Sequence, residues 1–198
     1  MQPKLKQLVN KGLLWQGRQT HYQEQRFLST GHPSLNELLG GGWQFDAVHE
    51  WQLDSPFIEQ KLLWPLLEQL HEMNQPIFWL NPPALLSAAG LRWRLKQADS
   101  LHIVLNTSAN EAAWAFEQIL QSGAGVAFLW QPESENQSSY VRRWQKAVQQ
   151  GHQMGFVLTA LEKTVEARAY TNRLHLHPNH TVDVVKRRYG WPVNNISL

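Results

Sequence analysis

The chain has 198 residues, of which 42% are hydrophobic and 17% charged, enough to bury one substantial core. It has no cysteine, which excludes disulfide scaffolds, zinc-thiolate centres and iron-sulfur clusters. Eighteen Lys and Arg side chains nearly balance sixteen Asp and Glu side chains, so the net charge of +2 does not by itself indicate nucleic-acid binding. No stretch approaches the roughly 18 to 20 apolar residues of a membrane helix, and the N-terminus lacks the apolar centre of a signal peptide. We therefore expect a cytoplasmic protein with no membrane partner.

The N-terminal region predicts a short amphipathic helix. Leu5, Leu8 and Leu13 recur at helical spacing after Pro3, a residue suited to a first helical turn, and would form a docking face. A polar stretch at residues 16–25 follows this helix. We therefore expect a helix and linker in residues 1–25 and a single α/β domain in residues 26–198.

A glycine-rich segment opens the predicted domain. Residues 33–39 form a short helix with one leucine face, and the glycines at residues 40–42 end it. A strand is predicted over residues 47–51. Ser55 and Pro56 then favour the start of a longer helix, expected to kink at Pro65, with an apolar stripe made of Ile58, Leu62, Leu66, Leu70 and Met73.

Short apolar runs alternate with helical patterns through the rest of the domain. The runs predict buried strands at residues 77–80, 101–105, 126–130 and 155–159, with helices at 109–121 and 140–150. Residues 173–177 and 181–187 predict an antiparallel hairpin at the sheet edge. This order favours an α/β fold with a mostly parallel sheet covered by helices on both faces. Four tryptophans that lie in or near apolar runs are interpreted as core residues: Trp64, Trp79, Trp114 and Trp130.

Two segments resemble the RecA family. Residues 30–42, with the strand ending at Glu50, are similar to the beginning of the RecA core, and residues 182–190 are similar to its late Lys-x-Arg strand. Between them, the chain resembles two related bacterial SOS-response groups, SulA and ImuA, at residues 60–70, 77–82, 89–91 and 151–156. The resemblance implies a RecA-like three-layer core.

The two groups imply different partners. SulA proteins block cell division by binding the division GTPase FtsZ, whereas ImuA proteins accompany the polymerases ImuB and DnaE2 in damage-induced translesion synthesis. SulA typically lacks the glycine-rich segment and the basic closing strand, and both are present here. We therefore favour an ImuA-type adaptor that contacts ImuB-like or DnaE2-like polymerases, RecA or DNA. A SulA-type inhibitor that binds FtsZ is the alternative, and an unrelated partner also stays open.

The resemblance places residues 53–61 over the phosphate-binding loop when Glu50 is aligned with the strand-end glutamate of the family. Such a loop needs glycine backbone N–H groups and a lysine that reaches the phosphates. This segment has no glycine and carries bulky side chains, Glu59 stands near the lysine position, and Lys61 comes two residues late. Residues 130–131 are Trp and Gln where a metal-binding carboxylate is required. We expect a degenerate P-loop with no ATPase activity, no catalytic residue and no cofactor.

Two basic clusters are candidate contacts for DNA or a protein partner. One is Arg142, Arg143 and Lys146, for which a solvated helix face is the simpler interpretation. The other combines cations with aromatic rings, a composition typical of surfaces that bind a phosphate backbone and stack bases, and consists of Lys186, Arg187, Arg188, Tyr189 and Trp191.

The histidines offer a weak metal signal. His175 and His177 alternate along a predicted strand and so share one face, with His180 in the following turn. No second ligand cluster can be assigned from the sequence, and we therefore predict no metal site.

Overall fold

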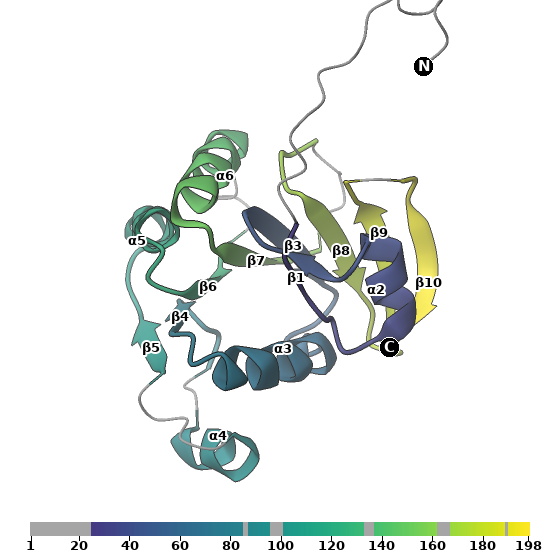
Figure 1. Ribbon diagram of the computed structural model, residues 1–198, viewed down its shortest axis with the longest axis horizontal. Helices are drawn as coiled ribbons and strands as arrows, with labels where there is room; N and C mark the ends of the chain where they lie inside the picture. Colours follow the sequence, from purple (N-terminus) through teal and green to yellow (C-terminus); the bar gives the residue numbers. More distant parts are fainter. Residues whose placement is uncertain (1–24, 85–86, 96–100, 133–136, 162–166, 189) are drawn as a thin grey trace, which may run out of the picture.

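The structure is a computed structural model that describes residues 25–84, 87–95, 101–132, 137–161, 167–188 and 190–198 (Figure 1). Its centre is an eight-stranded sheet in which six neighbouring strands are parallel and two strands at one edge are antiparallel. Across the sheet the order is β10 (Val193–Ser197), β9 (Thr181–Lys186), β8 (Asn172–Leu176), β3 (Ala47–Leu53), β7 (Met154–Ala160), β6 (Val126–Trp130), β4 (Ile77–Leu80) and β5 (His102–Leu105). A separate two-stranded sheet joins β1 (Phe27–Leu28) and β2 (Trp43–Gln44).

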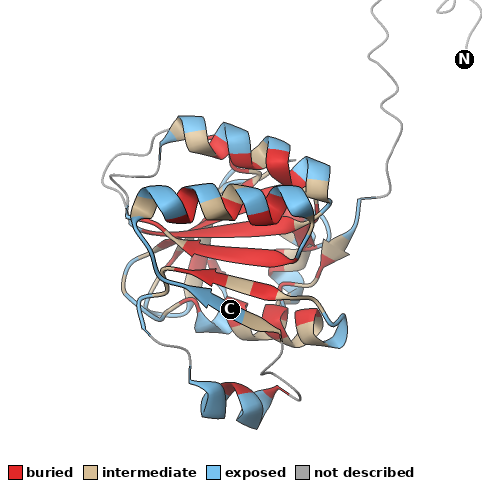
Figure 2. Cartoon of the chain, turned by 90° about the vertical axis from the view of Figure 1, so that its left-hand side faces the viewer, coloured by how far each residue is buried: buried red, intermediate tan, exposed pale blue. Residues whose placement is uncertain are grey.

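Helices cover both faces of the large sheet. One face carries α2 (Pro33–Leu39), α3 (Gln60–Glu72) and α4 (Ala88–Arg94), and the other carries α5 (Ala109–Ser122) and α6 (Ser138–Gly151). Figure 2 shows the buried strands between helices whose outer surfaces are exposed. The predicted α/β fold, with a mostly parallel sheet and a C-terminal antiparallel hairpin, is confirmed.

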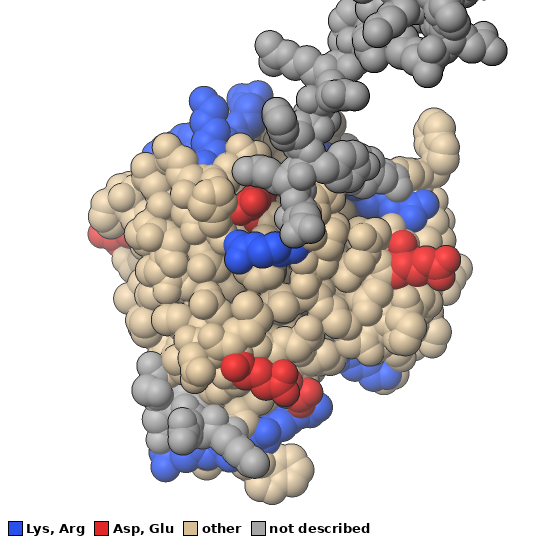
Figure 3. Space-filling model, viewed as in Figure 1, with Lys and Arg blue, Asp and Glu red and all other residues tan. Residues whose placement is uncertain are grey.

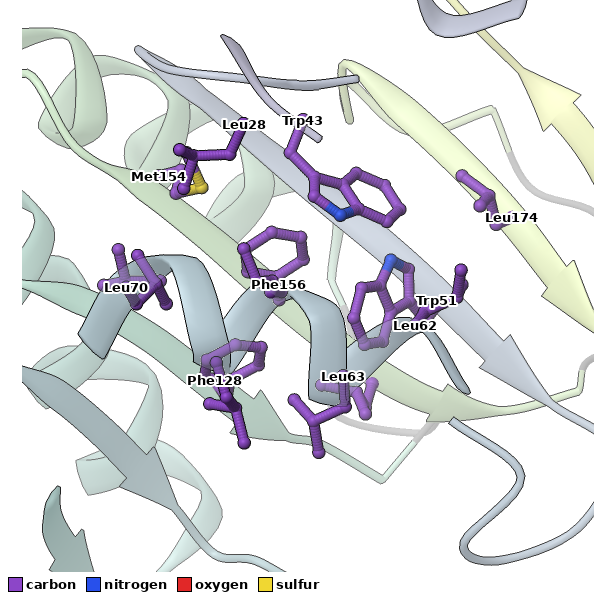
Figure 4. Close-up of a cluster of buried hydrophobic side chains, with 14 of the residues drawn as sticks. Leu28, Trp43, Trp51, Leu62, Leu63, Leu70, Phe128, Met154, Phe156 and Leu174 are labelled. Atoms are coloured by element: carbon purple, nitrogen blue, oxygen red, sulfur yellow. The ribbon is translucent and has the colours of Figure 1, made fainter. Parts of the chain in front are cut away.

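The larger of the two cores lies between the sheet and α3 and is rich in aromatic rings. Trp43, Trp51 and Phe156 meet with ring centroids 5.0 to 5.4 Å apart, and Phe128 stacks on Phe156 at 5.0 Å (Figure 4). The other core joins α5 and α6 to the opposite face, where Phe116 packs edge-on against Trp144 at 5.1 Å. Large rings in such contacts bury much apolar surface per residue, and this packing defines the orientation of each layer.

The four strands predicted from continuous apolar runs are present, and three of them are covered on both faces. The fourth, β5, is an edge strand whose Ile103, Val104 and Leu105 are 37 to 39% exposed, so the expected burial on both faces is wrong there. β4, β6 and β7 lie inside the sheet between the two helical layers, so they have no polar face. The helix predicted over residues 109–121 is also confirmed. It begins with a capping box in which the Ser108 hydroxyl and the Glu111 carboxylate bond to each other's backbone N–H groups.

The predicted start of the long helix is wrong. The chain makes a turn at residues 56–59, and α3 begins only at Gln60, because Phe57 has a positive φ of 68° that no helix accepts. The helix continues through Pro65 to Glu72. Its buried stripe is Leu62, Leu66 and Leu70, whereas Ile58 precedes the helix and Met73 is 45% exposed.

Three further expectations need correction. The central strand β3 runs to Leu53, so Glu50 lies within the strand and not at its end. The C-terminal hairpin is not outermost, because β8 pairs in parallel with β3 and an additional strand, β10, lies beyond β9. Trp114 points away from the core and is 60% exposed.

The glycine-rich segment has a structural role. Gly40 ends α2 with a left-handed φ of 77°, and a Cβ on Gly42 would lie 2.2 Å from the Leu28 carbonyl oxygen. The turn therefore lets β2 pair with β1. The predicted N-terminal helix and its face of Leu5, Leu8 and Leu13 lie outside the described residues. Within the residues that the structure describes, no helix is both long and apolar enough to span a membrane.

Candidate functional site

A pocket of about 570 Å³ opens at the carboxyl ends of the parallel strands. In open α/β sheets this edge is where ligands usually bind, because the loops that follow neighbouring strands diverge to opposite faces. Here the loops after β3, β4, β6 and β7 form the walls of the pocket, together with Thr107 and with Ala109, the first residue of α5. Its lining is mostly apolar and consists of Leu53, Asp54, Ser55, Pro56, Phe57, Asn81, Pro83, Thr107, Ala109, Trp130, Gln131, Pro132, Leu158, Thr159 and Ala160.

The loop after β3 has no glycine and presents bulky side chains to the pocket. Phe57 projects to the pocket with 49% of its surface exposed, so the bulky side chains of this loop line an open pocket and do not fill it. Glu59 is buried at the N-terminus of α3. Burial raises the pKa of the Glu59 carboxyl, although the backbone N–H groups of Glu59 and Phe57 oppose the rise.

Lys61 and Glu50, the two residues that the family alignment indicated, do not line the pocket. Lys61 points away from the pocket walls, and its Nζ donates to the Leu198 carbonyl oxygen at 3.4 Å. Glu50 is fully buried in β3, where Arg173 Nε donates to its carboxylate and Arg168 Nη1 lies 3.6 Å away. Glu50 therefore belongs to a buried ion cluster that joins β3 to β8, and it does not reach the pocket.

The C-terminal basic cluster is partly structural. Arg187 Nη1 donates to the Leu38 carbonyl oxygen at 2.8 Å and its Nε donates to the Trp191 carbonyl oxygen at 2.9 Å. Lys186 Nζ donates to the Arg168 carbonyl oxygen at 2.9 Å, and burial together with the positive charge of Arg173 lowers the Lys186 pKa. Arg188 and Trp191 are exposed, and Tyr189 lies outside the described residues.

The cluster on α6 is separate. Arg142, Arg143 and Lys146 are exposed, but Arg143 Nη2 lies 2.6 Å from Glu117 of α5 and so joins the two helices. Arg187 contacts α2 on the opposite face of the sheet. Figure 3 shows Lys and Arg side chains in separate groups on the viewed face, with acidic side chains among them. The structure does not bring the two predicted clusters into one surface.

Two histidines and two aspartates form a cluster that the sequence did not reveal. His175 Nε2 lies 2.8 Å from Asp54 Oδ1, and His177 Nδ1 lies 2.9 Å from Asp54 Oδ2. His177 Nε2 lies 2.9 Å from Asp183 Oδ2. The predicted shared face of the two histidines is present, but Asp54 is 121 residues from His175 in the chain, and no local pattern links them.

The hydrogen bonds of this cluster favour the charged forms of Asp54 and His177. Burial raises the pKa of Asp54, but hydrogen bonds from His175 and His177 outweigh it, so this pKa lies below its ordinary value. Burial lowers the pKa of His177, whereas hydrogen bonds to Asp183 and Asp54 raise it, and the net shift is upward. The carboxylates are therefore ionised at neutral pH.

Comparison with known proteins gives a distant similarity. No protein-family model matches the chain. The chain is 25% identical to the cell division inhibitor SulA of Klebsiella aerogenes over 130 residues, which cover 64% of this chain and 75% of that protein. The cell division inhibitor SulA of Citrobacter koseri matches with the same identity and coverage. This similarity supports membership of an SOS-associated group at most, and it favours our alternative interpretation, SulA, over the ImuA-type interpretation that we preferred from the sequence.

Proposed function

We propose that the protein is a SulA-type inhibitor of cell division that acts by binding FtsZ and blocking its polymerisation. In this proposal the chain is a RecA-like scaffold with a degenerate P-loop and has no ATPase activity. Support comes from the similarity to two SulA proteins and from the chemistry of the loop after β3. The polymerase partners that we favoured from the sequence have no comparable support.

The observation that carries the proposal is the apolar pocket, whose lining includes the half-exposed ring of Phe57. A nucleotide site at this edge would need backbone N–H groups and a cation for the phosphates. The loop offers instead an exposed aromatic ring and a buried acidic residue, and the strand ends offer Trp130 and Leu158. Exposed aromatic rings beside an apolar pocket are typical of the central contacts in protein–protein interfaces.

The direct test is FtsZ polymerisation followed by light scattering, with the protein present at equimolar concentration. We expect strong inhibition by the wild-type chain. Phe57→Asn should weaken the inhibition at least about tenfold, because loss of an aromatic interface anchor typically costs about 2 kcal/mol. Asparagine tolerates the positive φ at this position, so the fold should survive.

Met73→Gln is the matched control. Met73 is similarly exposed, at 45%, but it follows the C-terminal end of α3, whereas the pocket lies beside the segment that precedes this helix. Its substitution should leave inhibition unchanged. Unimpaired FtsZ polymerisation in the presence of the folded wild-type protein would contradict the proposal. Specific ATP turnover that is lost on Lys61→Ala would contradict the non-catalytic part.

The exposed cations at the end of β9 favour a second candidate, an ImuA-type adaptor. Lys186, Arg188 and Trp191 are accessible on this part of the surface. In that case ImuB-like or DnaE2-like polymerases, RecA or DNA would bind the chain, and Arg188→Glu would weaken the binding. The glycine-rich segment no longer distinguishes the candidates, because its turn and its contact with Arg187 have a structural explanation.

A further inference from the structure

Two chain segments, at the ends of β3 and β8, bring three metal-ligating side chains together beside the pocket. Asp54 follows β3, His175 lies in β8, and His177 comes directly after that strand. One ligand atom from each of these residues lies within 4.8 Å of the other two. The side chains are between 16% and 24% exposed, so they are held by the fold yet accessible to an ion from solvent.

A second layer of contacts orients these ligands. His177 Nε2 lies 2.9 Å from Asp183 Oδ2, which leaves its Nδ1 directed to Asp54. The backbone N–H of Asn195 donates to Asp183 Oδ1 at 2.7 Å and holds that carboxylate in place. Metal-ligating histidines almost always direct their second ring nitrogen to a carboxylate or carbonyl oxygen in this manner.

We propose that Asp54, His175 and His177 bind a divalent transition-metal ion of the zinc class, with Asp183 as a positioning residue. Two imidazole nitrogens and one carboxylate oxygen are ligands typical of zinc and its neighbours, whereas magnesium and calcium prefer oxygen alone. The two carboxylates balance the two positive charges of such an ion when both imidazoles are neutral.

The ligand atoms lie close to the spacing that such an ion requires. A zinc ion about 2.0–2.1 Å from each ligand atom keeps those atoms about 3–3.4 Å from one another. The Asp54 oxygens lie 2.8 and 2.9 Å from the two histidine nitrogens. All three ligand atoms lie within 4.8 Å of one another, so side-chain adjustments would be enough to close them around the metal, which then replaces the hydrogen atoms of these two contacts.

Zinc titration of the full-length protein, followed by calorimetry and by NMR of the histidine rings, tests the site. We expect one zinc ion per chain and resonance shifts in His175 and His177 before the other seven of the nine histidines. His177→Gln should reduce the affinity at least about tenfold, and Asp183→Asn should reduce it about 10- to 100-fold. Magnesium should produce no change.

His180→Gln is the matched control, because His180 lies three residues from His177 in the adjoining turn but outside the cluster. It should bind zinc as the wild type does. The site is refuted if the wild-type protein binds no zinc stoichiometrically, or if zinc first shifts histidines other than His175 and His177. Since the NMR measurement uses the unaltered chain, its result does not depend on whether a variant folds.

Discussion

His49 makes the stability of this protein sensitive to mild acid. The ring is fully buried in β3 between Trp43 and Phe156, with ring centroids 5.4 and 5.2 Å away. Its Nε2 lies 3.1 Å from the Gln44 carbonyl oxygen, and the Asn172 side-chain amide nitrogen lies 3.2 Å from its Nδ1. Only the neutral tautomer with hydrogen on Nε2 satisfies both contacts, because a protonated Nδ1 would face the amide N–H of Asn172.

Burial lowers the His49 pKa from 6.5 to about 4, although the hydrogen bond to Gln44 opposes the shift. The unfolded chain therefore binds a proton on this ring at a higher pH than the folded chain does. The contribution of His49 to folding is fully present above pH 6.5 and is lost as the pH falls toward 4. The whole loss is about 3 kcal/mol, and at pH 4.5 it is already about 2 to 3 kcal/mol.

Urea unfolding at pH 7.5 and pH 4.5 measures this loss in the wild-type protein and in His49→Gln. Glutamine keeps one donor and one acceptor but does not titrate. The fall in the free energy of unfolding between the two pH values should therefore be smaller in the variant by about 2 to 3 kcal/mol. His180→Gln, which removes a histidine in an exposed turn, should keep the wild-type fall. An equal fall in His49→Gln and wild type would refute the reasoning.

Three further predictions concern stability and use the same unfolding measurement at neutral pH. Gly42→Ala should lower the free energy of unfolding by about 3 kcal/mol or more, because the added Cβ would clash with the Leu28 carbonyl oxygen. The Cβ added in Gly40→Ala has no atom within 4 Å, so this variant should lose only about 1 kcal/mol. Equal losses in the two variants would contradict this account. Arg173→Met should cost about 3 kcal/mol because it removes a partner of the buried Glu50. Arg143→Met breaks the ion pair with Glu117, in which the Arg143 side chain is 54% exposed, and should cost less than about 1 kcal/mol. The reverse order would be inconsistent with the burial of Glu50. Ser108→Ala should cost about 1 kcal/mol through loss of the α5 cap, and an unchanged stability would show that the capping box contributes nothing.

Local sequence patterns were sufficient for most of the fold. The apolar runs that became β4, β6 and β7 are too short and too continuous for amphipathic helices, so they indicate strands buried on both faces. The helices α2, α5 and α6 were likewise predicted from local patterns, which include apolar spacing in α2 and α5 and the glycines that end α2 and α6. The error at the start of α3 occurred because Phe57 adopts a conformation that its residue type disfavours.

The candidate site was predicted less well, because its residues come from distant segments. The loop after β3 has no glycine in the sequence, but no local pattern indicated that a pocket of about 570 Å³ opens there. Arg187 was predicted as a binding residue because it lies in a cluster of cations and aromatic rings at the end of the chain. Its bonds to the Leu38 and Trp191 carbonyl oxygens depend on how β9 lies against α2, which no local pattern specifies.

The sequence by itself determined the class of the fold, the alternation of strands and helices, and the absence of cysteine chemistry. The alternation of strands and helices follows from hydrophobic periodicity and backbone propensity, and both of these act over only a few neighbouring residues. Only the tertiary structure decided which polar groups meet. Parallel pairing of β3 with β8 aligns Glu50 with Arg173 and brings Asp54 to His175 and His177. Such contacts follow from strand order and register, which the packing of the whole sheet sets.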